Sequence, residues 1–446
     1  MDAAGVIGCF KDRSILITGS TGFLGKMPVE KILRVQPDVR KLYLIVRAAD
    51  AASAENRVLT EIFCTGCRNK TRSKHGADFD SFITNKITAL PGDIIKETCA
   101  LRNSMVEQIY EEIHVIVSVA ATTSFYERYD VALASNTLGV AHVCDLAKKC
   151  ANLKMLLHVS TAFVAGEQEG LLVEKPLDAG KALRKDYSLD IQSELKLVES
   201  VKSKLRVQFS NDKIEKRKMK ELGLKRTMDM LYVAYNDQKL SCFIFNRNVI
   251  IDVIPGDMVI NALMVAMALH WEKHGTQAIY HVTSGHRNPL RGSTFLESFY
   301  EYFHSNPRVT KDGRIVKHGR VTLFKKYTFF SLYMILRYKL ALEAFHVMSV
   351  FGHSLSQHYN KLNRGYKFLI LIAKLYAPYA FFKGCFDDTN MKKLWAITAT
   401  EELDDGSTFD CDPACIDWDS YLINTHIPAA LMYASNNNQM KKAGSA

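Results

Sequence analysis

The sequence predicts an α/β fold: a doubly wound parallel sheet in the N-terminal part, followed by a mostly helical C-terminal domain. Three observations support this prediction. Apolar, β-branched runs alternate with helical patterns from Ser14 to Val164, as in sheets whose parallel strands are joined by helices. A glycine-rich turn directly follows the first of these runs. Further along, two long apolar stretches carry scattered lysines and arginines, a pattern typical of helices.

Five runs are the predicted strands. Each is apolar almost throughout rather than alternating, which indicates strands that are covered on both faces. Helical patterns separate them; one ends near Val35 after the first strand, and one covers Val131–Cys150 before the fifth. In chain order the runs are Ser14–Ser20, Lys41–Ala48, Lys86–Ile94, His114–Thr123 and Lys154–Val164.

The turn after the first strand, in ILITGSTGFLGKMPVEKIL, has the glycine spacing G-x-x-G-x-x-G. Gly19 permits the tight turn, Gly22 lets the backbone approach a pyrophosphate, and Gly25 lets the helix and strand pack closely. The N–H groups at the start of the following helix then face the phosphates. This pattern indicates a dinucleotide-binding site. The residues predicted to hold the dinucleotide here are Thr18, Gly19, Thr21, Gly22, Phe23, Leu24 and Gly25.

Residues that follow the next three strands extend the predicted cofactor site. Arg47 stands where a fold that prefers NAD would place an acidic residue, so we expect its guanidinium to accommodate the 2′-phosphate of NADP(H). The alternative is a solvated surface arginine. We expect Asp93 and Ile94 along the adenine edge, and Ala120 and Ala121 where the cofactor passes close to small side chains. Ordinary turn chemistry is the alternative for both pairs.

Pro28 lies within the first two turns of the helix that follows the glycine turn. It has no N–H, and its ring crowds the carbonyl of Leu24. We therefore expect this helix to be kinked or to have a shortened first regular turn, while the phosphate site remains.

Length and charge limit the possible partners. The chain of 446 residues is longer than the roughly 250–300 residues that one hydrophobic core usually supports, and we expect two domains, residues 1–290 and 291–446. A formal charge of +11 favours polyanionic partners such as a nucleotide, coenzyme A or an anionic membrane. The basic residues are scattered and no nucleic-acid-binding motif is present, so nucleic acid is not an expected partner.

Cysteine usage favours reduced thiols in a cytosolic setting. Cys64 and Cys67 form a lone C-x-x-C, and Cys411 and Cys415 form a lone C-x-x-x-C, without a matching second pair nearby. Zinc is the weaker alternative, and no metal site is expected. The start of the sequence has neither a signal-peptide pattern nor an arginine- and serine-rich presequence, so we expect no cleaved targeting peptide.

Two apolar segments, Tyr327–Phe351 and Tyr366–Phe382, are predicted helices interrupted by cations. Neither contains about 18 uncharged apolar residues in a row, so nothing clearly spans a bilayer. One interpretation is a pair of buried helices in the C-terminal domain. The other is a pair of interfacial helices that lie on a membrane and extend their lysines into the headgroup region.

These motifs together resemble one family nearly from end to end. TGSTGFLG, LIVRA, PGDI, VAATTSFYERYDVAL, HVSTAFV and DVIPGDMVINALM are similar to the plant alcohol-forming fatty acyl-CoA reductases, which are extended short-chain dehydrogenases/reductases with a Rossmann sheet. YHVTSGHRNPL, FFKGCFDDTNMKKL and IDWDSYLINTHIP resemble that family's C-terminal domain, shared with male-sterility proteins.

The resemblance implies a function and a site. It implies reduction of a long-chain or very-long-chain acyl-CoA to a primary alcohol with two NADPH, by way of an aldehyde, in wax, suberin or related lipid metabolism. Thr161, with Ser160 beside it, matches the catalytic Ser/Thr after the fifth strand, and Asn136 matches the asparagine of the preceding helix. Thr122 and Asn136 complete the expected cofactor contacts. The family also implies peripheral association with a membrane, on the cytoplasmic face of the endoplasmic reticulum, or a cytoplasmic location.

The chain departs from the family at its proton donor. Relatives place a Tyr-x-x-x-Lys helix and a sixth strand after the charged region, whereas here Arg226 is followed directly by sequence that matches a later segment. Roughly fifty to sixty residues of the family pattern are missing near residues 226–227. Tyr235 and Lys239 have the right spacing, but Asn236 and Asp237 weaken a helix between them. We interpret the pair as a coincidence.

Three functions are compatible with this sequence. The first is an NADPH-dependent fatty acyl-CoA reductase whose turnover is impaired by the missing segment. The second is a pseudoenzyme that binds NADP(H), and acyl-CoA or a full-length relative, without turnover. A different short-chain reductase or epimerase is the weakest, because it would need the same missing helix. The missing strand leaves an apolar sheet edge, so either residues 242–252 take its place or the domain is less stable than its relatives.

Overall fold

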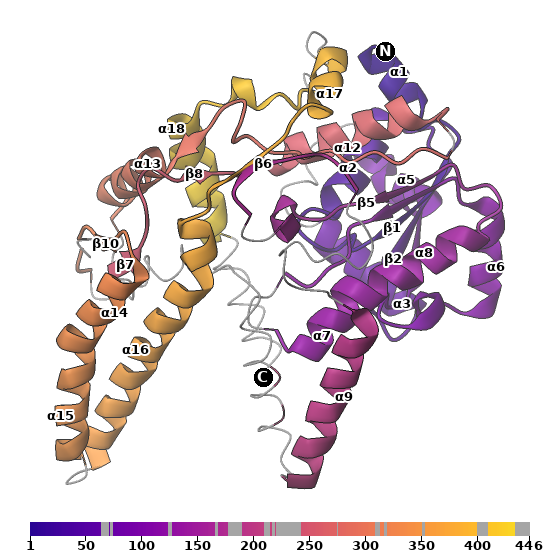
Figure 1. Ribbon diagram of the computed structural model, residues 1–446. Coiled ribbons are helices and arrows are strands. Elements are labelled where there is room, and N and C mark those ends of the chain that lie inside the picture. Colours follow the sequence, from indigo (N-terminus) through magenta and orange to yellow (C-terminus); the bar gives the residue numbers. More distant parts are fainter. Residues whose placement is uncertain are drawn as a thin grey trace.

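The computed structural model contains a parallel sheet with helices on both faces, and a mostly helical part that includes a long helical hairpin (Figure 1). This architecture confirms the predicted fold class. The residues that the structure describes are 1–63, 71, 75–123, 127–165, 168–176, 190–208, 215, 219, 242–273, 275–307, 313–315, 319–349, 353–398 and 409–432.

The sheet holds five parallel strands in the order β3–β2–β1–β4–β5. In the central strand, Ile15 lies opposite Leu42 on one side and Val115 on the other. All five side chains of β1 are buried, as the apolar pattern of this run predicts. Each predicted run contains one strand: β1 Ser14–Thr18, β2 Lys41–Val46, β3 Ile87–Pro91, β4 Val115–Ser118 and β5 Met155–His158.

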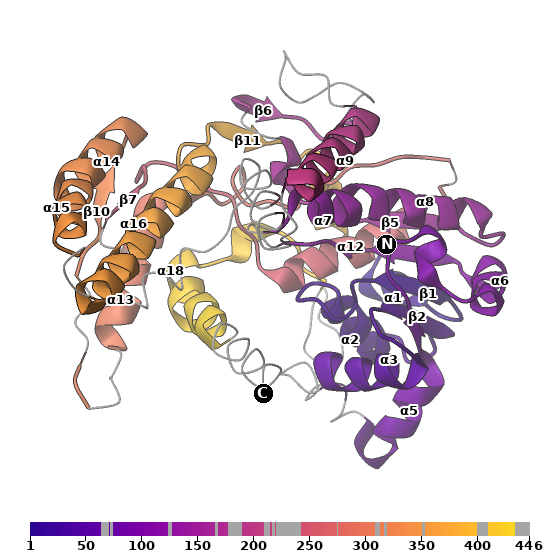
Figure 2. The ribbon, with the colours of Figure 1, turned by 90° about the horizontal axis from the view of Figure 1, so that it is seen from below.

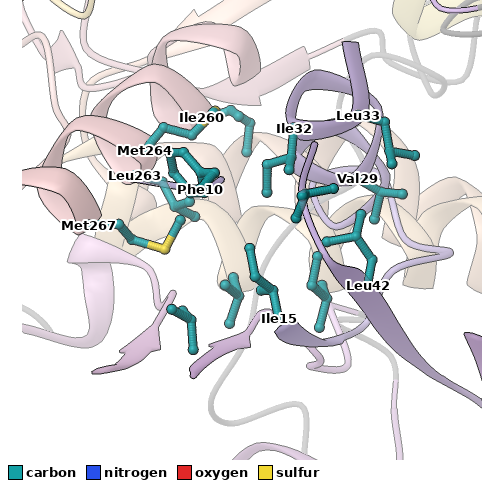
Figure 3. Close-up of a cluster of buried hydrophobic side chains, with 14 of the residues drawn as sticks. Phe10, Ile15, Val29, Ile32, Leu33, Leu42, Ile260, Leu263, Met264 and Met267 are labelled. Carbon is teal, nitrogen blue, oxygen red and sulfur yellow. The ribbon is translucent and has the colours of Figure 1, made fainter. Parts of the chain in front are cut away.

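One face of the sheet packs against helices from two distant parts of the sequence. Ile15 contributes to a core that also contains Ile32 of the helix after the glycine turn and Met264 of a helix about 230 residues later (Figure 3). The helices that line this face are α2 Lys26–Val35, α3 Ala51–Arg57, α5 Phe79–Lys86 and α12 Gly256–His270, with α1 Ala3–Gly8 beside α12. Figure 2 shows α2, α3 and α5 on the same side of the strands.

The opposite face of the sheet has a second core. Leu16 and Ile116 point to this side, because successive side chains of a strand alternate between the two faces. They pack against Ile109 and Val143, which belong to helices α6 Asn103–Glu112 and α8 Gly139–Lys149. Before α8, the predicted helix 131–150 contains α7 Tyr129–Leu133 and a π-helical turn, η4 Ala134–Leu138.

Helix α2 follows the glycine turn directly, with Gly25 at its N-cap position. Its first helical residue is Lys26, so Pro28 is the third residue of the helix. At this position an N–H has no partner inside the helix, and a proline costs little. Pro28 thus lies in the first turn of α2, and a kink or shortening caused by it remains a prediction.

The edge strand β5 is less covered than the centre of the sheet. Met155, Leu156 and Leu157 are half-buried and His158 is exposed. Within the described residues β5 pairs only with β4, although α12 packs on one of its faces. The idea that residues 242–252 replace the missing strand is wrong. Strand β7 Cys242–Ile244 instead pairs with β10 Thr322–Phe324 in a separate sheet.

Short strands connect the N-terminal part with the C-terminal part. Strand β6 Gly170–Leu172 pairs with β11 Gly384–Phe386, and β8 Ile250–Ile251 pairs with β9 Leu290–Arg291. Glu174, just after β6, is buried and accepts hydrogen bonds from the backbone N–H groups of His281 (2.7 Å) and Asn390 (2.5 Å). Burial raises the pKa of this carboxyl group. A domain boundary near residue 290 remains a prediction.

The two predicted C-terminal helices form a hairpin that lies at the opposite end of the molecule from the sheet (Figures 1 and 2). One arm runs without a break through α14 Tyr327–Met334, a π-helical turn η6 Ile335–Lys339 and α15 Leu340–Ser349, and the other is α16 His353–Ala380. The inner face is buried, with Phe330 and Met334 packed against Ile372. Within the described residues, no helix is both long enough and apolar enough to cross a membrane.

Further helices are α9 Ile191–Gln208, α13 Gly292–Ser305, α17 Met391–Thr398, α18 Trp418–Tyr421 and the π-helical turn η8 Leu422–His426.

Candidate functional site

The glycine turn lies at the carboxyl end of β1, where it contacts the loop after β4. Gly19 has a φ of +72°, and a Cβ atom added there would lie 2.7 Å from Cα of Ala120. A Cβ atom on Gly25 would lie 2.0 Å from the carbonyl oxygen of Gly19. Both positions therefore require glycine. The turn is closed by a hydrogen bond of 2.9 Å from the N–H of Gly22 to the carbonyl of Gly19.

Thr18 fixes the position of the neighbouring loop. Its buried hydroxyl oxygen accepts hydrogen bonds from the N–H groups of Val119 (3.2 Å) and Ala120 (3.1 Å). This places Ala120, half-buried, directly beside Gly19. The small residues predicted to let the cofactor pass are thus brought together from two strand ends.

One polar atom in the glycine turn is buried without a hydrogen-bond partner in the part of the chain that the structure describes. The hydroxyl oxygen of Ser20 is fully buried and makes no hydrogen bond within the described residues. Such atoms are usually satisfied by a ligand or by water. A buried hydroxyl of this kind, in a turn whose close backbone contacts require glycine, fits the residues present to a bound dinucleotide. Among the other predicted contacts, Phe23 is 63% exposed, and Thr21 and Leu24 are half-buried.

The predicted cofactor residues after β2 and β3 lie at the same edge of the sheet. Arg47 is exposed, and its backbone carbonyl accepts a hydrogen bond from the guanidinium of Arg57 (2.6 Å). One carboxylate oxygen of Asp93 accepts from the N–H of Ile95 (3.2 Å), so part of its capacity serves the local turn. Ile94 is buried, and its carbonyl contacts the ring of His142 (2.8 Å).

Asn136 holds the loop after β4 by two hydrogen bonds. Its side-chain oxygen accepts from the N–H of Thr122 (2.7 Å), and its side-chain nitrogen donates to the carbonyl of Thr122 (3.0 Å). This amide therefore positions the backbone of the residue after Ala121. Ala121 itself is exposed. The π-helical turn η4 brings Asn136 to this place.

Ser160 and Thr161 follow β5, and both are exposed. The hydroxyl oxygen of Thr161 accepts a hydrogen bond of 3.3 Å from the N–H of Phe163. An exposed hydroxyl at the carboxyl end of a strand can donate a hydrogen bond to a substrate oxygen. The predicted Ser/Thr pair thus lies at the same sheet edge as the glycine turn, as parallel strands require.

His158 is a neighbour that the sequence analysis did not identify. Its Nδ1 lies 3.3 Å from the hydroxyl oxygen of Ser118, which joins the carboxyl ends of β5 and β4. Desolvation of the ring where these strand ends meet lowers the pKa of His158 below its ordinary value. The sequence does place one polar residue at the end of each of these strands, Ser118 and His158. Only the strand order shows that the two residues meet.

The C-terminal part contacts the segment that carries Thr161. The ring of Phe163 lies 5.0 Å from that of Tyr379, 5.3 Å from that of Phe382 and 5.4 Å from that of Phe386, measured between centroids. Nothing in the local sequence pattern indicated this aromatic cluster, because Phe163 is more than 200 residues from the other three rings.

The predicted pair of Tyr235 and Lys239 lies outside the described residues. Tyr379 and Lys383 form a second pair with the same spacing. Helix α16 ends at Ala380, so these two side chains do not share a helical face. Within the described residues, no cluster of three histidine, cysteine or acidic side chains is arranged to hold a metal ion; Cys64 and Cys67 are not among them.

Comparison with known proteins gives a consistent family. A family model for the NAD-binding part of the male sterility protein matches residues 17–263, and a second model with the description male sterility protein matches residues 340–437. The chain is 35% identical to fatty acyl-CoA reductase 1 of Arabidopsis thaliana, covering 95% of this chain and 97% of that protein. It is also 35% identical to the alcohol-forming fatty acyl-CoA reductase of Simmondsia chinensis, covering 98% and 100%.

The aligned spans also show that this chain lacks residues that these relatives have. The two aligned spans are 480 and 494 residues long, whereas the whole chain has 446 residues. Part of each span therefore has no counterpart here. Among solved structures, the terminal R domain from the myxalamid biosynthetic pathway has a TM-score of 0.51 at 17% identity, covering 92% of this chain and 91% of that one. This similarity supports the fold.

Proposed function

This chain belongs to the male sterility family, which includes the fatty acyl-CoA reductases, and on that premise we propose that it is an NADPH-dependent reductase of long-chain acyl-CoA with impaired turnover. The product would be a primary fatty alcohol. The observation that carries the proposal is the juxtaposition, at one sheet edge, of a turn that accepts only glycine and the exposed hydroxyl of Thr161.

Cofactor binding rests on the glycine turn and on Arg47. The turn leads into the start of α2, whose first N–H groups can receive a pyrophosphate, and the exposed guanidinium of Arg47 can meet a 2′-phosphate beyond β2. When bound there, NADPH supplies hydride. Asn136 keeps the loop at Thr122 in the position that lines the cofactor's path.

The hydroxyl of Thr161 is the group best placed to act on the substrate. It donates a hydrogen bond to the carbonyl oxygen of the thioester and stabilises the negative charge that develops on that oxygen. Ser160, exposed beside it, can orient the same oxygen. Two hydrides and two protons then convert the thioester into alcohol and free thiol by way of the aldehyde. Each reduction therefore needs a proton donor as well as a hydride.

The missing segment removes the donor that the family places on a Tyr-x-x-x-Lys helix. In that arrangement a lysine one helical turn away lowers the phenol pKa of the tyrosine and prepares it to give up its proton. Without it, protons must come from water or a weaker acid. A positioned general acid contributes about 10²–10⁴-fold in rate, so we expect turnover lower by that factor.

The test compares this chain with a version in which the Tyr-x-x-x-Lys segment of a full-length relative is inserted between Arg226 and Thr227. Both are incubated with NADPH and acyl-CoA substrates of 16 to about 30 carbons, and fatty aldehyde and alcohol are measured. The inserted version should gain at least 10²-fold. Robust alcohol formation by the original chain would refute the impairment. If the original chain does form alcohol, loss of that activity in Tyr235→Phe or in Tyr379→Phe would identify the tyrosine that donates the proton.

A pseudoenzyme is the second candidate, favoured by the same missing segment. It would bind NADP(H) and acyl-CoA, or a full-length relative, and stay inactive even over long incubations. Tight binding of both ligands with no product, in the experiment above, would establish it. Copurification with a tagged full-length relative tests the partner.

We further propose that the hairpin of α14–α16 docks on an anionic membrane, at the cytoplasmic face of the endoplasmic reticulum. Its outer face exposes large apolar side chains at helical spacing, from Phe329 (60% exposed) to Val347 (66%). Between residues 321 and 380, Glu343 is the only acidic residue. Apolar stripes flanked by cations bind anionic lipid surfaces. The exposed cations are Lys325, Lys326, Arg337, Lys339, Lys361, Arg364, Lys367 and Lys374.

A further inference from the structure

A cavity of about 450 Å³ lies where α16 ends, beside the segment that precedes β6. Its volume is within the range of small-molecule sites, about 300–1,000 Å³. Phe381, Phe382 and Pro378 form the apolar part of the lining, and Lys374 and Lys383 contribute exposed cations. The cavity thus combines an apolar wall with positive charge at its rim.

The cavity adjoins the segment that carries Thr161. Phe382, one of its walls, contacts the ring of Phe163 at 5.3 Å, and Phe163 donates its N–H to the hydroxyl oxygen of Thr161. The pairing of β6 with β11 holds the two sides together, with a hydrogen bond of 3.3 Å from the N–H of Gly170 to the carbonyl of Lys383. A ligand that occupies the cavity therefore lies next to the predicted site of hydride transfer.

The charges at the rim include one internal ion pair. Glu169 and Lys383 form a salt bridge of 2.6 Å between Oε1 and Nζ, and both side chains are 67% exposed. Such exposed pairs are weak, about 0–1 kcal/mol, so a phosphate can displace the carboxylate. Gln168 supplies a side-chain amide to the lining, and this amide donates to the carbonyl of Ala165 (2.9 Å).

We propose that this cavity binds the coenzyme A part of the acyl thioester. Lys374 and Lys383 hold its phosphates, and the pantetheine arm lies along Phe381 and Phe382, so that the thioester reaches Thr161 past Phe163. This inference rests on the proposed function, because it takes an acyl-CoA as the substrate. A fatty acyl chain alone would make no use of two cations at the rim, which is why we assign the cavity to the coenzyme.

The test is calorimetric titration of the full chain with free coenzyme A at low ionic strength. Lys374→Glu and Lys383→Glu should each weaken binding about tenfold or more, since each replaces a charge-assisted contact by repulsion. Lys361→Glu is the matched control, because it makes the same charge change on an exposed residue of the same helix outside the cavity. It should change the affinity less than twofold.

Glu169→Gln gives a change of opposite sign. It removes the carboxylate that competes for Lys383, and coenzyme A should then bind about two- to fivefold more tightly. A purely structural role of the Glu169–Lys383 pair would give weaker binding instead. Circular dichroism and an NADPH titration on each sample show that the variants are folded.

Two results would overturn the assignment. One is coenzyme A affinity that is the same in Lys374→Glu, Lys383→Glu and Lys361→Glu; the other is no binding of coenzyme A by the unmodified chain. The reductase proposal is tested by a different experiment: it fails if the chain with the inserted helix makes no alcohol. Binding of free fatty acid but not of coenzyme A, weakened by Phe382→Ala, would assign the cavity to the acyl chain.

Discussion

Gly19 and Ala120 are in contact at the carboxyl edge of the sheet: a Cβ atom on Gly19 would lie 2.7 Å from both N and Cα of Ala120. The contact joins the turn after β1 to the loop after β4, and the hydroxyl of Thr18 holds that loop in place. The two strand ends therefore form one surface for the dinucleotide.

Gly19→Ala should destabilise the protein by about 3 kcal/mol and abolish NADPH binding. The new methyl group meets backbone rather than a movable side chain, and a φ of +72° disfavours any residue with a Cβ. Urea unfolding and fluorescence titration with NADPH measure the two effects. Gly365→Ala, in α16 with open space around it, should be neutral or stabilising by up to about 1 kcal/mol. Equal stability of both variants would contradict this assignment.

Arg47→Ala should weaken NADPH binding about tenfold or more and leave NADH binding unchanged, because only NADPH carries the 2′-phosphate that this guanidinium is proposed to meet. Fluorescence titration with each nucleotide provides the measurement. Arg40→Ala is the control, since Arg40 is an exposed arginine just before β2, at the opposite end of that strand. If Arg47→Ala weakens both nucleotides equally, Arg47 does not select NADPH.

Asp130 should make stability depend on pH under acidic conditions. Burial alone would raise the pKa of this carboxyl, but hydrogen bonds from Arg128 and Lys202 outweigh it and lower the pKa from 3.8 to about 2. A lowered pKa in the folded state stabilises the protein above pH 4, by about 2 kcal/mol. That contribution is lost as the pH falls from about 4 to about 2.

Asp130→Asn should therefore remove this part of the pH dependence, which urea unfolding between pH 2 and pH 6 would show. Asp145→Asn is the control: its partner Lys148 and Asp145 itself are 75% and 63% exposed, and exposed pairs contribute little. An unchanged profile in Asp130→Asn would mean that the Arg128–Asp130–Lys202 group does not stabilise the fold.

Leu336→Glu combined with Leu340→Glu should abolish binding to vesicles that contain anionic lipid. Both side chains are more than half exposed on the outer face of the hairpin, and the change replaces apolar contact with negative charge. Flotation with vesicles of phosphatidylcholine and phosphatidylserine is the measurement. Leu59→Glu, an exposed leucine near the sheet (47%), should float like the unmodified chain. Equal flotation of all three proteins would refute membrane docking by this face.

The sequence determined the local features of this protein. Apolar runs long enough for a strand predicted all five strands of the sheet, because side chains buried on both faces leave a continuous pattern. The glycine spacing predicted the turn, because a backbone at positive φ and in close contact admits little else. Pro28 lies within the first turn of α2, a place where proline is tolerated because that N–H has no partner inside the helix.

Only the tertiary structure decided which distant segments meet. It paired β7 with β10 rather than with the edge of the main sheet, placed Phe163 against Phe382, and set the amide of Asn136 on the backbone of Thr122. Such contacts join residues that are from 14 to more than 200 positions apart. Their partners are chosen by the packing of the whole chain, and no local pattern of residues records that choice.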